Sequence, residues 1–362
     1  MAQLAYKKNS EFVFQRLRSL YDDRVKDKIF ASFSIPSPTL VQFNKTHTAG
    51  PCDYPDPAER AAYWDSFLKE RTLIDDDSLP VCYMSEFDQG LYGGVIGGKV
   101  EYCCFESGWI SSMCRPILKN WSDVNSLRFD ESHPLFQQYI KQTKIFAEKA
   151  KDKFGISHLI LVDGFNFVFE LFGATETYMG MYDHPEEIQR AMEFGFDLNV
   201  LLHKTFFQYA PIFEDGTFCT LSEWIPGGEI ISESLDPFHM TSVETYMKWG
   251  HDYAQRMFDQ FDGGFLHIHG NGRHLIKPSS SLKGLKTIFL GDDRGFPPAL
   301  EVVYDLKNKA GDVPISILAD YNAFVEKLDR HELPGGILYR VLDTPSRDAA
   351  NKCYEKVLKY RV

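Results

Sequence analysis

The sequence lacks most of the features that mark secreted and membrane proteins. Its seven cysteines are an odd number without a C-x-x-C pair, which argues against a disulfide framework and against a structural zinc ribbon. The N-terminal stretch MAQLAYKKNSEFVF has no apolar core of a signal peptide, and no run approaches the roughly 20 apolar residues of a membrane helix. We therefore expect a reduced, cytoplasmic protein with no membrane partner.

Positive charge is also scarce. The 39 basic residues face 51 acidic ones, which leaves a formal net charge of −12. Nucleic acids and anionic membranes both bind through positive patches, so neither is expected as a partner. The sequence has no low-complexity tract and no linker-like segment that would divide it. We expect one domain over residues 1–362, as a monomer or a homodimer.

Three common nucleotide-binding and hydrolase motifs are missing as well. No G-x-S-x-G elbow and no G-x-x-x-x-G-K-[ST] loop occurs, so serine hydrolases of that type and P-loop nucleotide hydrolases are excluded. No apolar run is followed by G-x-G-x-x-G, which argues against a dinucleotide-binding fold.

What is present is an alternation of short apolar runs with amphipathic segments. The short runs are rich in β-branched and aromatic residues and are bounded by Gly, Pro or Asp, as buried strands are. Helices are predicted between them, over 134–153, from Asp183 onwards and after the capping box at Thr241–Glu244. The eight runs predicted as strands are residues 41–44, 81–87, 159–165, 218–224, 265–271, 288–293, 315–320 and 337–342.

Eight strands that alternate with helices predict a (β/α)8 TIM barrel, with an open doubly wound sheet as the alternative. Two segments do not fit the repeating pattern. Residues 1–38 are expected as an N-terminal helical segment outside the barrel. The glycine-rich residues 90–118 are expected as an insertion after the second strand, either a substrate lid or a small hairpin.

Polar groups stand where several predicted strands end. In a barrel these carboxyl ends converge on one mouth, where the active site lies. A strand-ending acid is more often a turn former or a helix cap, so the set carries more weight than any one member. A tryptophan after the fourth predicted strand either stacks on a ligand or plugs the barrel end. The candidates are Asp163, Glu223 and Glu86 for catalysis and Tyr83, Trp224, Asn271 and Asp293 for substrate binding.

The stretch GGFLHIHGN, residues 263–271, points to a metal. Side chains at i and i+2 of a strand share a face, so His267 and His269 project side by side. Two imidazoles suit zinc, and a catalytic zinc takes three protein ligands and keeps one position open. The alternative is a pair of core histidines bonded to neighbouring acids. We expect a carboxylate as third ligand and Asn271 with a neighbouring acid as supports of the rings; the candidate carboxylates are Glu86, Asp163, Glu223 and Asp293.

Three stretches, in order, resemble the uroporphyrinogen decarboxylase-like superfamily. FELFGATETYMGMYDHPEEIQRAME (169–193) is similar to the segment where members carry a YD-x-PE step into a helix. SESLDPFHMTSVETYMKWGHDYAQRMFDQF (232–261) is similar to a serine-rich turn with a long helix. HIHGN (267–271) stands where members have H-x-C-G-N or H-x-S-G. With YWDSFLKERTLIDDDSLP near the N-terminus, the likeness covers most of the chain and implies a (β/α)8 barrel.

The resemblance implies one of two activities. The first is cofactor-free decarboxylation of uroporphyrinogen, whose enzymes carry an arginine-rich N-terminal motif; the stretch VQFNKTHTAGPCDYPDP has no arginine cluster. The second is methyl transfer to or from a corrinoid on a partner protein, with zinc on H-x-C and a later cysteine. In this sequence His269 replaces the cysteine of that motif.

These features favour a zinc-assisted methyltransferase that moves a methyl group from a small methylated substrate to a corrinoid-binding protein. Zinc on two imidazoles and a carboxylate is a harder Lewis acid than thiolate-bound zinc. It therefore suits an ether, alcohol or amine better than a thiol. A decarboxylase and a non-catalytic ligand-binding barrel are the alternatives.

Overall fold

The chain has an α/β fold whose centre is a parallel sheet of six strands, ordered β1-β13-β12-β11-β10-β9. The computed structural model describes residues 3–47, 50–52, 55–104, 110–157 and 164–362. The strands of the sheet are β1 (Ile29–Phe33), β9 (Ile231–Ser234), β10 (Gly264–Ile268), β11 (Leu285–Leu290), β12 (Ile315–Asp320) and β13 (Ile337–Leu342).

Three smaller sheets complete the strand inventory of the described residues. One is parallel and pairs β3 with β6, one is an antiparallel sheet ordered β2-β4-β5, and one is the antiparallel hairpin β7–β8. Their bounds are β2 (Gly50–Cys52), β3 (Val81–Tyr83), β4 (Val100–Cys104), β5 (Ile110–Cys114), β6 (Gly155–Ser157), β7 (Gly216–Cys219) and β8 (Glu223–Pro226).

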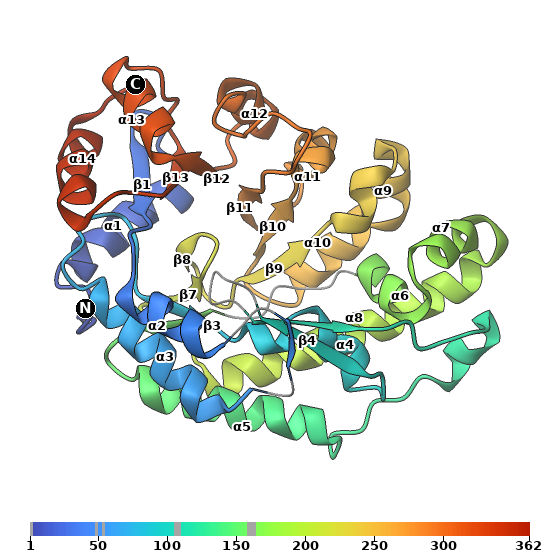
Figure 1. Ribbon diagram of the computed structural model, residues 1–362. Coiled ribbons are helices and arrows are strands. Elements are labelled where there is room, and N and C mark those ends of the chain that lie inside the picture. The colour runs from blue at the N-terminus through green and yellow to red at the C-terminus, as the bar shows by residue number, and fades with distance from the viewer. Residues whose placement is uncertain (1–2, 48–49, 53–54, 105–109, 158–163) are drawn as a thin grey trace.

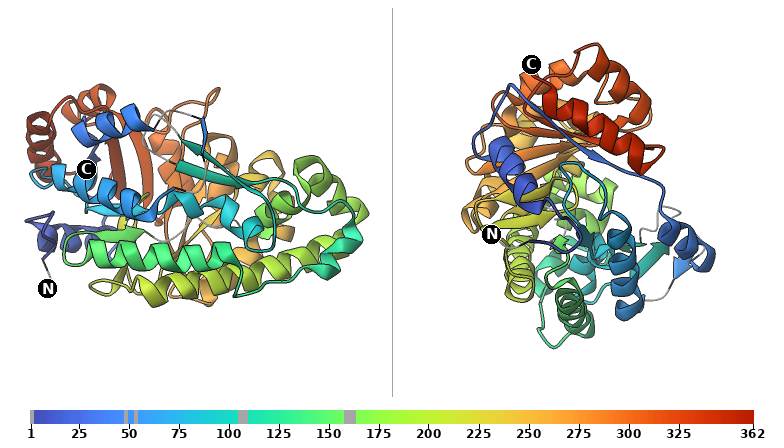
Figure 2. Two further views of the ribbon diagram at one scale, coloured as in Figure 1. Left: turned by 60° about the horizontal axis from the view of Figure 1, so that its bottom comes forward. Right: turned by 90° about the vertical axis from the view of Figure 1, so that its left-hand side faces the viewer.

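Helices lie along the outside of the six-stranded sheet and beside the smaller sheets (Figure 1). The long helices α5 and α8 run side by side (Figure 2). The α-helices are α1 (Ser10–Tyr21), α2 (Pro38–Thr46), α3 (Pro57–Glu70), α4 (Gln89–Gly94), α5 (Pro134–Ala150), α6 (Gly164–Phe172), α7 (Ala174–Asp183), α8 (Pro185–Tyr209), α9 (Val243–Trp249), α10 (His251–Asp259), α11 (Ile276–Ser279), α12 (Val303–Ala310), α13 (Tyr321–Asp329) and α14 (Arg347–Lys359).

The parallel register aligns the residues that later form the candidate site. His267 of β10 lies opposite Ser234 of β9 and Phe289 of β11. Because all six strands run the same way, their carboxyl ends share one edge of the sheet. Loops that leave this edge therefore meet each other, as the sequence pattern predicted.

The closed TIM barrel is not confirmed. Within the described residues the six-stranded sheet ends at β1 and at β9, and β3 and β6 form a sheet of their own. The structure thus shows a mostly parallel α/β arrangement with an open seam between β1 and β3. None of the described helices has the length and apolar character needed to span a membrane.

Two of the predicted strands are wrong. Residues 41–44 lie in helix α2, because Ser37 caps its first turn by accepting the Leu40 N–H and Pro38 occupies its first position. Residues 218–224 form the two arms of the β7–β8 hairpin and not one strand of the main sheet. The strands that take part instead are β1 and β9, which are buried at every position.

The segment 1–38 is therefore not only helical. It holds helix α1 and also β1, which pairs in parallel with β13. Residues 90–118 do form an insertion, since β4 and β5 make an antiparallel hairpin that pairs with β2. Residues 158–163 of the predicted strand 159–165 lie outside the described residues.

The predicted strands in the C-terminal half are confirmed, except that residues 269–271 and 291–293 lie beyond the ends of β10 and β11. The helix predicted from residue 134 is confirmed as α5, whereas Ser242 and not Thr241 caps α9, and Asp183 ends α7 instead of opening α8. β10 to β13 fall within the predicted runs or extend them at the start by a few residues. Ser242 caps α9 by accepting the Thr245 N–H, and α8 starts at Pro185. These features depend on local sequence, and for that reason they could be predicted from it.

Candidate metal centre

Three side chains at the carboxyl edge of the sheet form a cluster with metal-ligand chemistry. Asp236, His267 and His269 each place one ligand atom so that all three atoms lie within 4.8 Å of one another. The two imidazole rings are 4.4 Å apart between centroids, with an angle of 55° between their planes. His269 Nε2 lies 3.7 Å from Asp236 Oδ1. All three residues are half-buried.

Two neighbouring strands and a helical turn position the cluster. His267 belongs to β10, and His269 follows directly after its end. Asp236 begins η3 (Asp236–Met240), the 3-10 turn that follows β9. Gly291, just after β11, lies close to both rings: a Cβ there would stand 3.3 Å from His269 Nδ1 and 3.4 Å from His267 Nε2. A glycine at this position therefore leaves room for the pair.

Asp293 holds the His269 ring from the side away from Asp236. Its Oδ1 lies 2.9 Å from His269 Nδ1, and its Oδ2 accepts the N–H of Asn271 at 3.4 Å. Burial opposes ionisation of Asp293, but the charge and hydrogen bond of His269 outweigh it and lower the pKa of the carboxyl. A carboxylate behind a histidine in this way fixes the ring and makes it a better metal ligand.

Burial favours the neutral form of two imidazoles here, those of His267 and His239. Burial lowers the pKa of His267 to about 4, with Asp236 acting against this shift and His269 in its favour. A third ring, that of His239, is buried 5.7 Å from the His269 ring, and burial lowers its pKa to about 4 as well. Neutral imidazole carries the lone pair that binds a metal ion.

A cavity of about 380 Å³ has Asp236 in its wall, whereas His267 and His269 do not line it. Three elements supply most of the wall: α6, the start of α4 and the end of β5 in the inserted hairpin. The hairpin therefore encloses part of the cavity, which gives a physical basis to the lid interpretation of residues 90–118. The residues around the cavity are Gln89, Met113, Cys114, Pro116, Asn166, Phe169, Glu170, Gly173, Ala174, Asp236 and Pro237.

The described wall of this cavity contains no lysine, arginine or histidine. Burial raises the pKa of Glu170 well above its ordinary value, although the carboxyl accepts the Gly93 N–H at 2.8 Å. Burial also raises the pKa of the Cys114 thiol to about 12. Burial thus favours the neutral forms of Glu170 and Cys114, and apart from Asp236 the described wall holds no other ionisable side chain, which suits an uncharged ligand better than a polycarboxylate.

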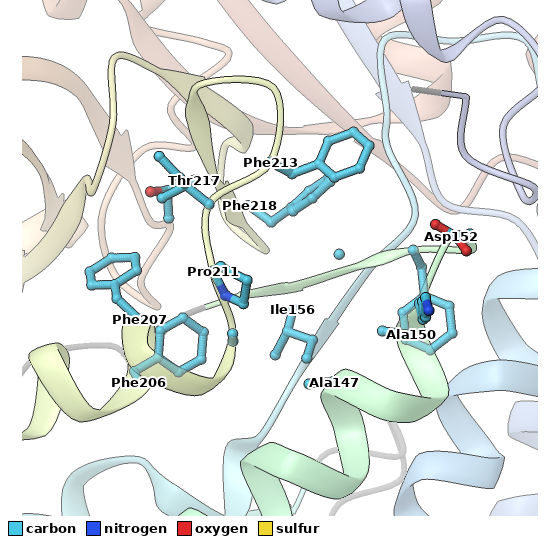
Figure 3. Close-up of a pocket in the computed structure, with 15 residues that line it drawn as sticks. Ala147, Ala150, Asp152, Ile156, Phe206, Phe207, Pro211, Phe213, Thr217 and Phe218 are labelled. Carbon is cyan, nitrogen blue, oxygen red and sulfur yellow. The ribbon is translucent and has the colours of Figure 1, made fainter. Parts of the chain in front are cut away.

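A second cavity, of about 270 Å³, is lined mainly by aromatic and aliphatic side chains and lies apart from the cluster (Figure 3). Phe206, Phe207, Phe213 and Phe218 supply much of its surface. None of the three ligand residues contributes to it. The convergent polar groups that a reaction needs are therefore found at the cavity beside Asp236 and not here.

Two residues predicted for the site are buried elsewhere in the protein. Glu86 lies in η1 (Ser85–Phe87), where it forms a buried ion pair with Arg60 and accepts a hydrogen bond from Gln142 at 3.2 Å. Tyr83 is fully buried in β3. The carboxylate that completes the cluster with the two histidines is Asp236, which was not among the predicted candidates Glu86, Asp163, Glu223 and Asp293.

The remaining predicted residues divide between two places. Asn271 and Asp293 lie beside the histidines, as described above. Trp224 is fully buried against Phe14 of α1 and donates its N–H to Phe213 O at 3.0 Å, so it plugs the sheet end instead of stacking on a ligand. Glu223 lines a different cavity, treated below. Asp163 lies outside the described residues.

Sequence reasoning missed Asp236, although a signal for it existed. The rule that polar groups stand at strand ends would have selected Asp236 if residues 231–234 had been recognised as a strand. Their sequence, Ile-Ser-Glu-Ser, lacks the apolar character on which that recognition depends. The role of Gly291 could not be found in this way, because it depends on distances between strands.

Comparison with known proteins supports the fold. No protein-family model matches the sequence, and no curated protein matches it. Among solved structures, the chain is similar to a methyltransferase from Methanosarcina mazei, with a TM-score of 0.60 and 10% sequence identity over 95% of this chain and 97% of that one. At this identity the likeness shows a shared fold, and membership of the uroporphyrinogen decarboxylase-like superfamily stays a prediction.

Proposed function

We propose that this protein is a metal-assisted methyltransferase that moves a methyl group from a small methylated compound to a corrinoid carried by a partner protein. The observation that carries the proposal is the Asp236–His267–His269 cluster, whose Asp236 also lines a cavity that has no lysine, arginine or histidine in its described wall. The shared fold with a methyltransferase is consistent with it. The corrinoid acceptor follows from the superfamily resemblance.

The residues of the cluster fit a divalent metal, for which zinc is our proposal. Two imidazole nitrogens and one carboxylate oxygen are a common catalytic zinc set with an open fourth position. Asp236 Oδ1 is buried and makes no hydrogen bond within the described structure, and a cation would satisfy it. When bound, zinc would act as a Lewis acid on the heteroatom that carries the methyl group.

The chain's own groups would bind the substrate and supply a proton to the heteroatom that loses the methyl group. Gln89 and Asn166 offer amides to an oxygen or nitrogen of the substrate. As the methyl group leaves, the heteroatom keeps the bonding electron pair and needs a proton. Glu170 lines the same cavity, and burial, which raises the pKa of its carboxyl, favours the protonated form that would donate this proton. Asp293 keeps the His269 ring in place throughout.

The proposal includes a (β/α)8 barrel of the uroporphyrinogen decarboxylase-like type in the cytoplasm. It is supported by parallel strands β1, β3, β6 and β9 to β13, which follow one another along the chain with helices between them. The decarboxylase alternative is weaker, because an anionic tetrapyrrole needs cations and the described wall of the cavity offers none. Uroporphyrinogen should therefore release no carbon dioxide with this protein.

Metal content is the first test. Purified wild-type protein should hold about one zinc per chain by mass spectrometry, and His267→Ala, His269→Ala and Asp236→Ala should each lose it. His251→Ala is the matched control, since this histidine contacts Ser281 on another part of the surface. Equal zinc content in the His251→Ala control and in the three cluster variants would refute the assignment of the metal centre.

Turnover is the second test. Under anaerobic conditions, wild-type protein with reduced cobalamin and a methyl donor should form methylcobalamin, which its absorption spectrum reports. Methanol, a methoxylated arene and methylamine cover the ether, alcohol and amine classes. Loss of the signal in His267→Ala with retention in His251→Ala would support the proposal. Failure of all three donors with zinc-loaded protein would favour a ligand-binding barrel.

A further inference from the structure

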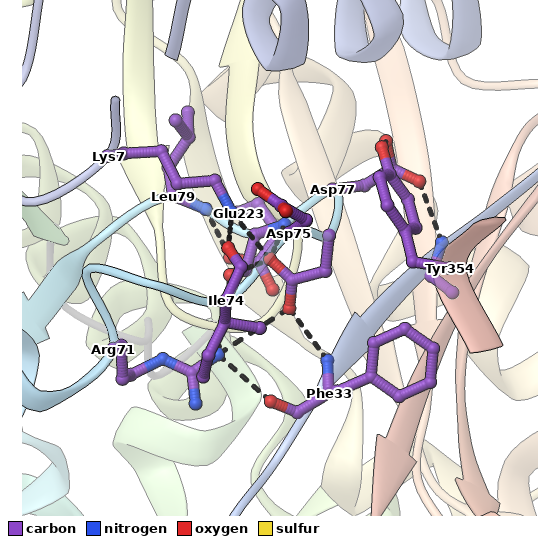
Figure 4. Close-up of polar contacts among 12 residues, drawn as sticks. Lys7, Phe33, Arg71, Ile74, Asp75, Asp77, Leu79, Glu223 and Tyr354 are labelled. Atoms are coloured by element: carbon purple, nitrogen blue, oxygen red, sulfur yellow. Dashed lines mark hydrogen bonds and ion pairs between the residues drawn. The ribbon is translucent and has the colours of Figure 1, made fainter. Parts of the chain in front are cut away.

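The seam between β1 and β3 lacks the full ladder of backbone hydrogen bonds of a barrel and is bridged mainly by side chains, beside one backbone hydrogen bond from the Asp77 N–H to the Ala31 carbonyl at 2.9 Å. Asp76 Oδ2 accepts the N–H of Phe33, and Asp77 Oδ2 accepts the N–H of Ala31, both at 2.9 Å. Arg71 donates to the carbonyl of Phe33 at 2.9 Å. These contacts satisfy the free edge of β1 (Figure 4), so the two strands need not pair directly.

A cavity of about 240 Å³ lies at this seam. Its wall comes from the carboxyl halves of β1 and β13, from the segment before β3, from helix α3 and from the β7–β8 hairpin. We call it the seam pocket. Its lining residues differ from those of the cavity beside Asp236, and they include Glu223, which the sequence had placed among the site residues.

Three hydrogen-bond donors on residues of the seam pocket are buried without a partner. They are Arg340 Nε, Trp64 Nε1 and the hydroxyl of Thr220. Trp64 is only 7% exposed. An unsatisfied buried donor costs roughly 1–3 kcal/mol, and all three belong to residues that line one cavity, which is consistent with a ligand that accepts hydrogen bonds. Oxygen atoms of an anion would meet this need.

The charges around the seam pocket also favour an anion. Lys7 pairs with Asp76 at 2.7 Å, and Arg71 lies 3.6 Å from the same carboxylate. Glu223 is the acid that interacts electrostatically with Arg340, and it accepts the Leu79 N–H at 3.2 Å. This described cluster thus contains the three cations Lys7, Arg71 and Arg340 against the two acids Asp76 and Glu223.

The opposite wall is aromatic. Tyr63, Trp64 and Phe67 of α3 contact one another, with ring centroids 5.5 to 5.8 Å apart, and all three line the pocket. The volume lies below the ~300–1,000 Å³ typical of sites for drug-sized ligands. A ligand that fits has one charged end and a body of about one ring.

We propose that the seam pocket binds a small organic acid, with its carboxylate at Arg340, Trp64 and Thr220 and its apolar body on the rings of α3. Arginine is suited to this role because its planar guanidinium binds carboxylates bidentately. The Arg340 guanidinium is held in place by Phe289, whose ring lies 5.6 Å away. The ring centroids of Phe289 and His267 lie 5.3 Å apart, so the two side chains Arg340 and Phe289 separate an occupant of the seam pocket from the candidate metal centre.

Calorimetric titration of the full-length protein with benzoate tests this inference. Benzoate should bind wild-type protein, and benzamide, which has the same shape without the charge, should bind at least about 10-fold more weakly. Arg340→Met should weaken benzoate binding by at least about 10-fold, and Trp64→Phe should weaken it by a smaller factor. The control Arg256→Met, which breaks an exposed pair with Glu193, should bind as wild type does.

Two further measurements make each outcome decisive. His267→Ala should bind benzoate as wild type does, which separates this site from the metal centre and from the proposed function. Thermal denaturation reports whether Arg340→Met is folded; if it is not, the comparison of benzoate with benzamide on wild-type protein decides. Equal binding of the two compounds, no benzoate binding to wild type, or undiminished binding to folded Arg340→Met would each overturn the inference.

Discussion

Replacing Asp293 by asparagine tests the metal centre without touching a ligand atom. The substitution keeps the size of the side chain but removes the negative charge that stands 2.9 Å from His269 Nδ1. An amide holds an imidazole less strongly than a carboxylate and makes it a poorer donor. Loss of such a supporting group lowers metal affinity by about 10- to 100-fold, which corresponds to about 1.4–2.7 kcal/mol of binding free energy.

The assay is a competition titration of metal-free protein with zinc against a chromophoric chelator at fixed pH and ionic strength. The Asp293 side chain is 30% exposed, so the melting temperature of the metal-free variant should change little. Asp320→Asn is the matched control, because Asp320 also ends a strand but caps α13 by accepting the Ala323 N–H, a role that asparagine fills equally well. Equal zinc affinity in the two variants would refute the assigned role of Asp293, and absence of zinc binding in wild type would refute the centre itself.

Three further substitutions probe the site and its support. Gly291→Ala adds a methyl group 3.3–3.4 Å from both imidazoles and should lower zinc affinity more than stability, with Gly291→Val lowering it further in the same titration. Asp76→Asn leaves the buried Lys7 without its ion pair and should lower the free energy of unfolding in urea by about 3–5 kcal/mol at pH 7. Lys7 and Arg71 lower the pKa of Asp76 against the effect of burial. The stability advantage of wild type should therefore decline as pH falls below about 4 and vanish below the folded-state pKa of Asp76. Glu170→Gln should be at least as stable as wild type at pH 8. Burial raises the pKa of Glu170, so wild type loses stability as pH rises above about 4.3, the ordinary pKa of glutamate. The reasoning would be contradicted if the difference in melting temperature between Glu170→Gln and wild type did not shrink between pH 8 and pH 4.

Several elements of the fold were predictable because local sequence specifies them. The capping serine of α9 accepts a backbone N–H of the first turn, and the proline at the start of α8 has no N–H that would need a partner there. β12 and β13 are continuous apolar runs, as buried parallel strands are. By contrast, β9 was missed since its polar residues face neighbours supplied by other segments, and no local pattern reveals that burial.

The candidate site shows the same division. The period of two in a strand by itself determined that His267 and His269 share a face, because side-chain direction along a strand depends on backbone geometry alone. Tertiary structure decided that Asp236 meets them and that Asp293 supports the ring, since both contacts join residues from different strand ends. It also decided that Glu86 forms a buried ion pair with Arg60, and that Glu223 and Arg340 both line the seam pocket. Ion pairs depend on the distances between side chains in the folded protein, and the sequence gives only the order of those side chains along the chain.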